Sequence, residues 1–225
     1  PGNADAAILN AGERTGSDWV PAEVDVSIRP GWFHHAAEDM QVKSIEHLLK
    51  IYYESVGRGA NLILNVPPDR RGLLHENDVK ALREWRRILD ATFAEDLAAD
   101  AVATASNTRG NDSRYAPDNV LDCKRDCFWT TDDGVTTPEL VVDMGNPVTF
   151  NVVRISEHLP LGQRIDSFAL DCWKNEKWVE FAAGTSIGNQ RLVRSGNITS
   201  SRVRLRITKA AACPAISRFG LFRSR

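Results

Sequence analysis

Two kinds of hydrophobic spacing alternate along the first 95 residues. Apolar residues at every second position over 24–28 predict a strand. Apolar residues spaced three and four apart over 45–56 then predict a helix with one buried face. Ser44 is placed to cap the start of this helix, and Gly57 and Gly59 are placed to end it.

A second strand and a second helix follow. The apolar run NLILNV over 61–66 suits a strand buried on both faces of a parallel sheet, and two prolines end it. The helix expected after it has an apolar stripe from Val79 to Phe93, with Glu76 and Lys80 able to pair on its outer face. Two successive strand–helix units predict a parallel α/β sheet. Because two parallel strands cannot cover a sheet or close a barrel, either other segments complete the layer or the chain is the tail of a larger protein.

The pattern changes from about residue 103, where helical stripes give way to short alternating runs separated by turn residues. Regular short strands of this kind predict a β-sandwich. We therefore expect a multidomain chain of class α/β plus all-β, with residues 1–97 in the first part and residues 98–225 in the second. The runs are ELVVDMG, FNVVRIS, SFALDCW, KWVEFAAG, SRVRLRIT and ISRFGLF.

Charge and composition exclude several classes of partner. The net charge of −2 gives no basic excess to attract nucleic acid or an anionic membrane. No apolar run is long enough to span a bilayer. The first residues resemble a loop within a protein rather than a signal peptide, so we expect further sequence upstream. Arg202, Arg204 and Arg206 alternate along one strand face, and we expect that face to be solvated.

Cysteine spacing argues against a metal site. Cys123 and Cys127 are spaced C-x3-C with no histidine nearby, which makes zinc improbable. Free thiols or a local disulfide remain as alternatives, and the pairing is left open. The four cysteines are Cys123, Cys127, Cys172 and Cys213.

Three stretches, in the same order, resemble the α-L-fucosidases of glycoside hydrolase family 29, in particular the branch that acts on α-1,3/1,4-linked fucose. They are WVPAEVDVSIRPGWFHH, IYYESVGRGANLILNVPPDRRGLLHENDV and LGQRIDSFAL. The resemblance implies a catalytic (β/α)8-like barrel followed by a β-sandwich of the coagulation factor 5/8 type C, or discoidin, kind. Residues 1–97 would then be the final βα units of the barrel, and residues 98–225 a sandwich like a carbohydrate-binding module.

The resemblance also implies a sugar pocket at the end of the first strand. Trp32 matches a family aromatic that packs against the sugar, and its ring suits the apolar side of fucose; the alternative is a tryptophan that only packs. Glu23 matches a family glutamate near the pocket, and we expect Trp19 and Arg29 to contribute to substrate binding. Arg29 could equally form a structural ion pair with Asp25. His34 and His35 share this loop, but neither is expected to act as a general base.

The family's chemistry needs groups that are not expected in this sequence. Retaining hydrolysis uses two carboxyl groups about 5–5.5 Å apart, one as nucleophile and one as acid/base. Both are expected upstream of the chain, and Glu13 and Glu23 are only weak candidates for the acid/base. We expect no metal ion and no cofactor.

The resemblance thus implies the C-terminal part of a retaining α-L-fucosidase that removes terminal fucose from fucosylated oligosaccharides or glycoconjugates. The parent protein is expected to be secreted, periplasmic or extracellular, and the chain alone to be inactive without its upstream barrel segment. The alternative is a non-catalytic glycan-binding module with a barrel remnant. In that case exposed aromatics at the loop tips of the sandwich, such as Tyr115 or Trp129, would bind glycan, although Trp129 is the better candidate for the core.

Overall fold

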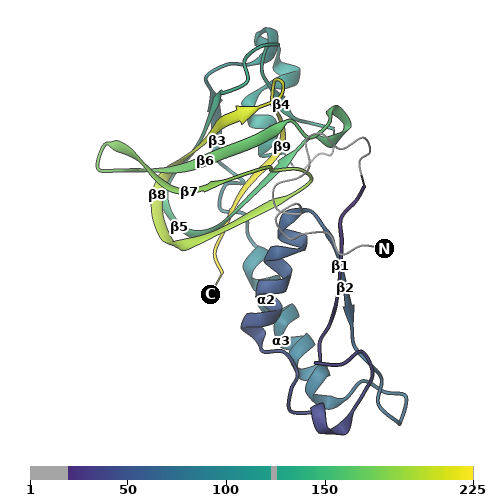
Figure 1. The fold of residues 1–225 in the computed structure, drawn as a ribbon. Helices are drawn as coiled ribbons and strands as arrows, with labels where there is room; N and C mark the ends of the chain where they lie inside the picture. The colour runs from purple at the N-terminus through teal and green to yellow at the C-terminus, as the bar shows by residue number, and fades with distance from the viewer. Residues whose placement is uncertain (1–19, 123–125, 225) are drawn as a thin grey trace.

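The computed structural model describes residues 20–122 and 126–224. Its first part is built from two parallel strands and two helices, and Figure 1 shows both helices side by side along one side of the strands. The strands pair in register from Glu23 opposite Asn61 to Ser27 opposite Asn65. The two predicted strand–helix units are therefore confirmed. The elements are β1 (Glu23–Ser27), α2 (Ile45–Glu54), β2 (Asn61–Asn65) and α3 (Glu76–Phe93).

The predicted ends of α2 are confirmed. The Ser44 side chain accepts a hydrogen bond from the backbone amide of His47 at 3.3 Å. After α2 the chain makes one 3-10 turn, and this turn ends at Gly59. The φ of Gly59 is 80°, a value that only glycine adopts readily. The expected pairing of Glu76 with Lys80 is not found, because Glu76 contacts Arg71 in the preceding loop at 2.8 Å.

Strand β2 is less buried than its apolar sequence predicts. Ile63 keeps 42% of its surface exposed, and Asn61 is also exposed. Within the described residues β2 pairs only with β1, and α2 and α3 lie on the same side of this two-stranded sheet (Figure 1). The prediction of burial on both faces is therefore wrong for this structure, which leaves one face of β2 uncovered.

The second part is a sheet of long antiparallel strands folded into a sandwich. The strand order is β4-β9-β5-β8-β6-β7, with β3 added beside β5. The runs ELVVDMG and FNVVRIS, expected as separate strands, form one strand, β5, whose pairing with β8 shifts register between Asp143 and Val148. The strands are β3 (Val102–Ala105), β4 (Trp129–Thr130), β5 (Glu139–Glu157), β6 (Ile165–Lys174), β7 (Lys177–Gly184), β8 (Arg191–Ala210) and β9 (Ala215–Phe222).

Short 3-10 helices lie in the connections of the described chain. They are η1 (Ala36–Glu38), η2 (Val56–Arg58), η3 (Arg109–Asn111), η4 (Ser113–Tyr115), η5 (Pro117–Val120) and η6 (Leu159–Leu161). No helix in the described residues combines the length and apolar character needed to span a bilayer.

The sandwich core is aromatic and fully enclosed. Trp129, Phe150 and Phe219 expose at most 1% of their surface. The Trp129 indole nitrogen also donates to the backbone oxygen of Asn107 at 3.0 Å, which satisfies its one polar group. Trp129 is therefore a core residue, as favoured from the sequence, and it cannot bind glycan at a loop tip. Tyr115, the other aromatic considered there, is half-buried and lies against Phe128, with ring centroids 5.5 Å apart.

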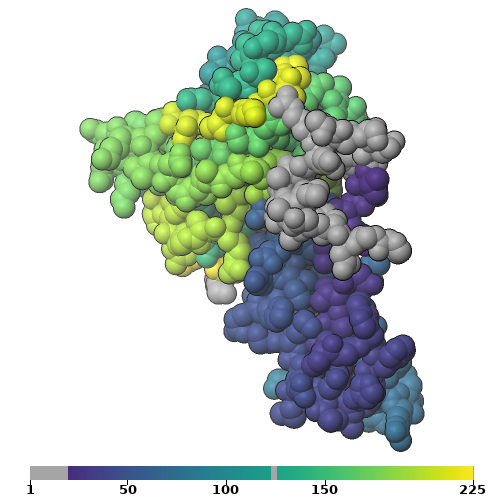
Figure 2. Space-filling view, viewed as in Figure 1, coloured from purple at the N-terminus to yellow at the C-terminus, as the bar shows by residue number. Residues whose placement is uncertain are grey.

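A second, smaller cluster joins the two parts, and the space-filling view shows the first part as a narrow lobe against the broader sandwich (Figure 2). Phe93 of α3 packs edge-on against Phe222 of β9, with centroids 5.1 Å apart. The Arg154 guanidinium lies against both rings, at 4.8 and 4.7 Å from their centroids. This junction gives the helices of the first part a packed support on the sandwich.

The arginine face of β8 differs from its prediction. Arg204 and Arg206 both donate to the buried carboxylate of Asp171, at 2.8 and 2.7 Å, so they are not merely solvated. Burial alone would raise the pKa of Asp171, but the hydrogen bonds from Arg206 and Arg204 outweigh it and lower the pKa. Arg202 lies over the Trp173 ring, 4.2 Å from its centroid.

Among the cysteines that the structure describes, all three are free thiols, which favours one of the two alternatives left open. They are Cys127, Cys172 and Cys213, and Cys123 lies outside the described residues.

Candidate functional site

The loops that follow β1 and β2 lie together, because the carboxyl ends of the two parallel strands share one edge. Open edges of this kind are where ligands bind in parallel α/β sheets and barrels. The first loop, residues 28–39, is called the Trp32 loop below. The second, residues 66–75, leads into α3. Their contacts define the candidate site.

Trp32 is displayed at this edge with 51% of its surface exposed, while its backbone is held by both strands. The Asn65 side-chain amide at the end of β2 donates to the Trp32 carbonyl at 2.9 Å. The Ser27 hydroxyl at the end of β1 donates to the Gly31 carbonyl at 2.7 Å. The ring is thus exposed on a fixed backbone, which is the arrangement expected of a binding surface.

Arg29 is buried beneath the same loop with no exposed surface. Its Nε donates to both carboxylate oxygens of Asp78, at 3.1 and 3.0 Å, and its Nη1 donates to Asp39 at 2.8 Å. Burial works to lower the pKa of Arg29, but the hydrogen bonds to Asp78 and Asp39 outweigh it and the pKa is raised. The guanidinium therefore stays charged and is paired with two carboxylates.

Asp39 joins the Trp32 loop to the start of α3. Its Oδ1 also lies 3.1 Å from His34 Nε2, and its Oδ2 lies 3.3 Å from His75 Nε2. His75 Nδ1 accepts the backbone amide of Asn77 at 3.2 Å, so the ring proton of neutral His75 is on Nε2 and faces Asp39. The hydrogen bond from Arg29 is the main cause that lowers the pKa of Asp39.

A shallow groove of about 430 Å³ opens between the two loops. Seven of its eight lining residues are polar or charged. The lining residues are His34, His35, Ala36, Asp69, Arg70, Arg71, His75 and Glu76.

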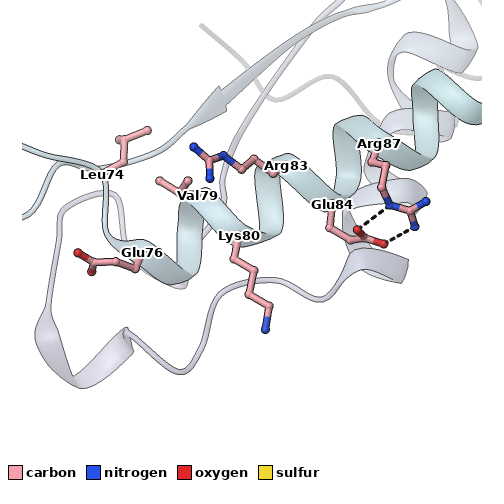
Figure 3. A pocket seen from close by; sticks show the side chains of 7 residues that line it. All are labelled: Leu74, Glu76, Val79, Lys80, Arg83, Glu84 and Arg87. Atoms are coloured by element: carbon pink, nitrogen blue, oxygen red, sulfur yellow. Dashed lines mark hydrogen bonds and ion pairs between the residues drawn. The ribbon is translucent and has the colours of Figure 1, made fainter.

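A second open groove, of about 560 Å³, runs along the outer face of α3 (Figure 3). Leu74 and Val79 form its apolar part, and Glu84 pairs with Arg87 at 2.7 Å further along the helix. Glu76 pairs with Arg71 of the preceding loop, and Figure 3 shows Lys80 and Arg83 pointing in different directions, so the groove shows no constellation for catalysis. In the described residues there is no group of three or more histidine, cysteine, aspartate or glutamate side chains placed to hold a metal ion.

Comparison with known proteins covers both parts of the chain. Residues 102–219, more than half of the chain, match the profile of the F5/8 type C domain. The chain belongs to the F5/8 type C domain family. Residues 9–91, ahead of the F5/8 type C domain, match the profile of the α-L-fucosidases.

Relatives with the same two parts are similar over nearly the whole chain. Alpha-L-fucosidase 1 of Arabidopsis thaliana is 40% identical over 98% of this chain and 44% of its own length. The solved structure of SpGH29 is 34% identical, with a TM-score of 0.90 over 99% of this chain and 48% of that one. A Ruminococcus gnavus GH29 fucosidase in complex with fucose is 31% identical, with a TM-score of 0.88 over 95% of this chain and 43% of that one. The resemblance to the glycoside hydrolase family 29 α-L-fucosidases is thus confirmed, and the chain spans less than half the length of each of these relatives.

The structure brings together only some of the residues expected in the pocket ahead of the F5/8 type C domain. Trp32 and Arg29 lie in one loop, but Glu23 is exposed at the opposite end of β1, where the Asn61 side-chain amide approaches it at 3.5 Å. Glu13 and Trp19 lie outside the described residues.

The alternative in which Arg29 pairs with Asp25 is wrong. Asp25 is exposed on β1, whereas the Arg29 side chain, in the loop beyond the end of β1, is fully buried. Arg29 instead reaches Asp39 and Asp78, at separations of 10 and 49 residues. These two carboxylates were missed from the sequence. The available signal was an arginine directly after an apolar strand, because a buried guanidinium needs acidic partners.

The pairing of Arg71 with Asp69 at the rim of the groove leads to a testable prediction for the pKa of Asp69. The Arg71 guanidinium donates to Asp69 at 2.8 and 2.6 Å and lowers the pKa of Asp69 to about 2. Replacing Arg71 with alanine should move this pKa back toward its ordinary value of 3.8, although two backbone amides still donate to Asp69. The measurement is the carboxyl ¹³C shift of Asp69 as the pH is lowered.

Replacement of Arg70 is the matched control, since its neighbouring guanidinium is exposed, and it should leave the Asp69 titration unchanged. A lowered native pKa means that the stability provided by this pair is present above the unfolded value of 3.8 and is lost as the pH falls toward 2. An Asp69 that titrates alike with and without Arg71 would show that the pair does not form in solution.

Proposed function

We propose that the chain is the C-terminal part of a retaining α-L-fucosidase that releases terminal α-1,3/1,4-linked L-fucose from fucosylated oligosaccharides or glycoconjugates. The observation that carries this proposal is the exposed ring of Trp32, held at the shared carboxyl edge of two parallel strands. Similarity to α-L-fucosidases across both parts of the chain supports it. So does a similar R. gnavus fucosidase that is described in complex with fucose.

In this proposal β1, α2, β2 and α3 are the final βα units of a (β/α)8-like barrel. The uncovered face of β2 and the exposed Ile63 support it, because a two-stranded parallel sheet does not bury its own faces. Further strands of the same protein would continue the sheet. The active site of such a barrel lies at the carboxyl ends of the strands, where the Trp32 loop is found.

The proposed role of Trp32 is to form one wall of the fucose pocket. Fucose has an apolar side that includes its C6 methyl group, and an indole ring buries such a surface without requiring hydrogen bonds. Arg29 contributes indirectly, since Asp39 and Asp78 already occupy its guanidinium. Glu23 is about 13 Å from Ser27 along β1 and therefore does not share the wall with Trp32.

The proposed reaction places both catalytic carboxyl groups in the upstream part of the protein. One carboxylate attacks the anomeric carbon, and the covalent glycosyl-enzyme forms as the glycosidic bond breaks. The second carboxylic acid protonates the departing oxygen and then removes a proton from the water that releases fucose. The residues of this chain bind and orient the sugar during both steps.

Replacing Trp32 with alanine in the full-length protein should weaken fucoside turnover without unfolding it. If the ring covers roughly 60–80 Å² of apolar sugar surface, at about 25 cal/mol per Å² the loss is roughly 1.5–2 kcal/mol, or about ten- to thirtyfold in kcat/KM. The measurement is steady-state hydrolysis of an aryl α-L-fucoside.

The neighbouring Phe33 provides the matched control, because its ring is 79% exposed in the same loop. Phe33→Ala should leave kcat/KM within about twofold of the wild type. If the two substitutions lowered kcat/KM equally, Trp32 would not have the proposed role in the sugar wall. A change confined to KM would indicate equal contact with substrate and transition state, whereas a change in kcat would indicate that the contact tightens as the bond breaks.

A further inference from the structure

We infer that Asp39 is a positioning residue that fastens the Trp32 loop to the start of α3 and so fixes the sugar wall. The inference rests on the proposed function for its effect on turnover, but the contacts of Asp39 stand independently of it. They come from two segments: the Trp32 loop itself and the start of α3.

The carboxylate of Asp39 is contacted on both oxygens. Arg29 and His34 share Oδ1, at 2.8 and 3.1 Å, and His75 approaches Oδ2 at 3.3 Å. The Asp39 backbone carbonyl accepts the side-chain amide of Asn77 at 2.8 Å. One residue therefore ties its loop to α3 through both its side chain and its main chain.

Arg29, which contacts Asp39, is itself held in a buried ion pair with Asp78. Arg29 and Asp78 have no exposed side-chain surface, and Arg29 Nη2 lies 2.9 Å from Asp78. A fully buried guanidinium cannot change partners without leaving a charge unpaired, so it holds Asp39 in one place. Flexibility in the Trp32 loop is thereby limited on the side of α3.

The opposite side of the loop is tied to the strands, so Trp32 lies between two attachments. Asn65 holds the Trp32 carbonyl, and the Gly31 amide donates to Glu38 at 3.3 Å across the loop. Glu38 is the residue immediately before Asp39. A shift of Asp39 would therefore be transmitted through Glu38 to the backbone beside Trp32.

A double-mutant cycle in the full-length protein separates positioning from general destabilisation. Asp39→Asn keeps the shape of the side chain but removes the charge that Arg29 pairs with. Because hydrogen bonds to charged groups are stronger than those between neutral groups, we expect kcat/KM to fall about tenfold. In a Trp32→Ala background the same substitution should cost less than about twofold, because the ring that it positions is already gone.

Asp90→Asn is the control for removing a carboxylate that pairs with an arginine, since Asp90 pairs with Arg86 on the exposed face of α3. It should leave kcat/KM unchanged in both backgrounds. Equal losses from Asp39→Asn with and without Trp32, after correction for the folded fraction, would overturn the inference.

Amide hydrogen exchange in the 225-residue chain tests the same contacts without any activity. Asp39→Asn should raise exchange at Gly31 and Glu38 about tenfold while leaving Leu48, in α2, unchanged. Unchanged exchange in the Trp32 loop would refute the positioning role. A full-length wild type without fucosidase activity would instead refute the proposed function, and the exchange result would still decide the inference.

A milder substitution covers the case in which Asp39→Asn does not fold. His34→Phe removes one of the bonds to Asp39 and leaves the buried anchor intact. Because only one hydrogen bond is lost, we expect amide exchange in the Trp32 loop to rise about threefold, less than for Asp39→Asn. No increase at Gly31 or Glu38 would count against the inference.

Discussion

Replacing Asp78 with alanine should lower the free energy of unfolding of the strand–helix part by about 3–5 kcal/mol, because the buried guanidinium of Arg29 loses its main partner. Neither side chain of this pair has exposed surface, and Nε of Arg29 contacts both oxygens of Asp78. Water cannot replace the lost carboxylate without opening the loop. The measurement is urea-induced unfolding of the 225-residue chain followed by far-ultraviolet circular dichroism, to which α2 and α3 contribute strongly.

Asp90 offers a matched control on the same helix. It also pairs with an arginine, Arg86, but the two side chains are 58% and 77% exposed. Exposed ion pairs contribute little, so Asp90→Ala should leave the unfolding midpoint almost unchanged. If the two substitutions shifted the midpoint equally, the buried pair would not be the anchor that the geometry indicates.

Local features of the fold could be predicted from the sequence because their causes are local. The Ser44 cap, the stop at Gly59 and the alternation in β1 depend on residues a few positions apart, and all three are found. The joining of two expected strands into β5 could not be predicted, because it depends on the pairing with β8, which resumes after a register shift between Asp143 and Val148. The exposure of Ile63 also depends on which strands are present, not on its own segment.

The candidate site shows the same division between local and distant causes. Trp32 could be placed at the strand end because it follows β1 by a few residues. Asp39 and Asp78 could not be assigned to Arg29, since only the folding of α3 against the loop brings them together. The Asp171 pairs with Arg204 and Arg206 were missed for the same reason, because cross-strand partners depend on register.

The chain by itself should not hydrolyse fucosides. Retaining hydrolysis needs two carboxyl groups on opposite sides of one bond, placed with sub-ångström control. Near Trp32, the carboxylates of Asp39 and Asp78 are occupied by Arg29, and that of Glu38 accepts the Gly31 amide. Glu23 lies at the far end of β1. Loss of one member of a catalytic unit costs about four to six orders of magnitude in kcat, and loss of both leaves only binding.

The direct test compares the purified 225-residue chain with the same chain fused to the upstream part of its parent protein, using an aryl α-L-fucoside as substrate. The proposal predicts no release of the aryl group above background from the chain alone. It predicts release from the fusion, reduced about ten- to thirtyfold by Trp32→Ala. Robust turnover by the chain alone that is abolished by Glu13→Gln or Glu23→Gln would contradict the assignment of the catalytic pair to the upstream part. A fusion that folds but releases nothing would contradict the proposed function itself.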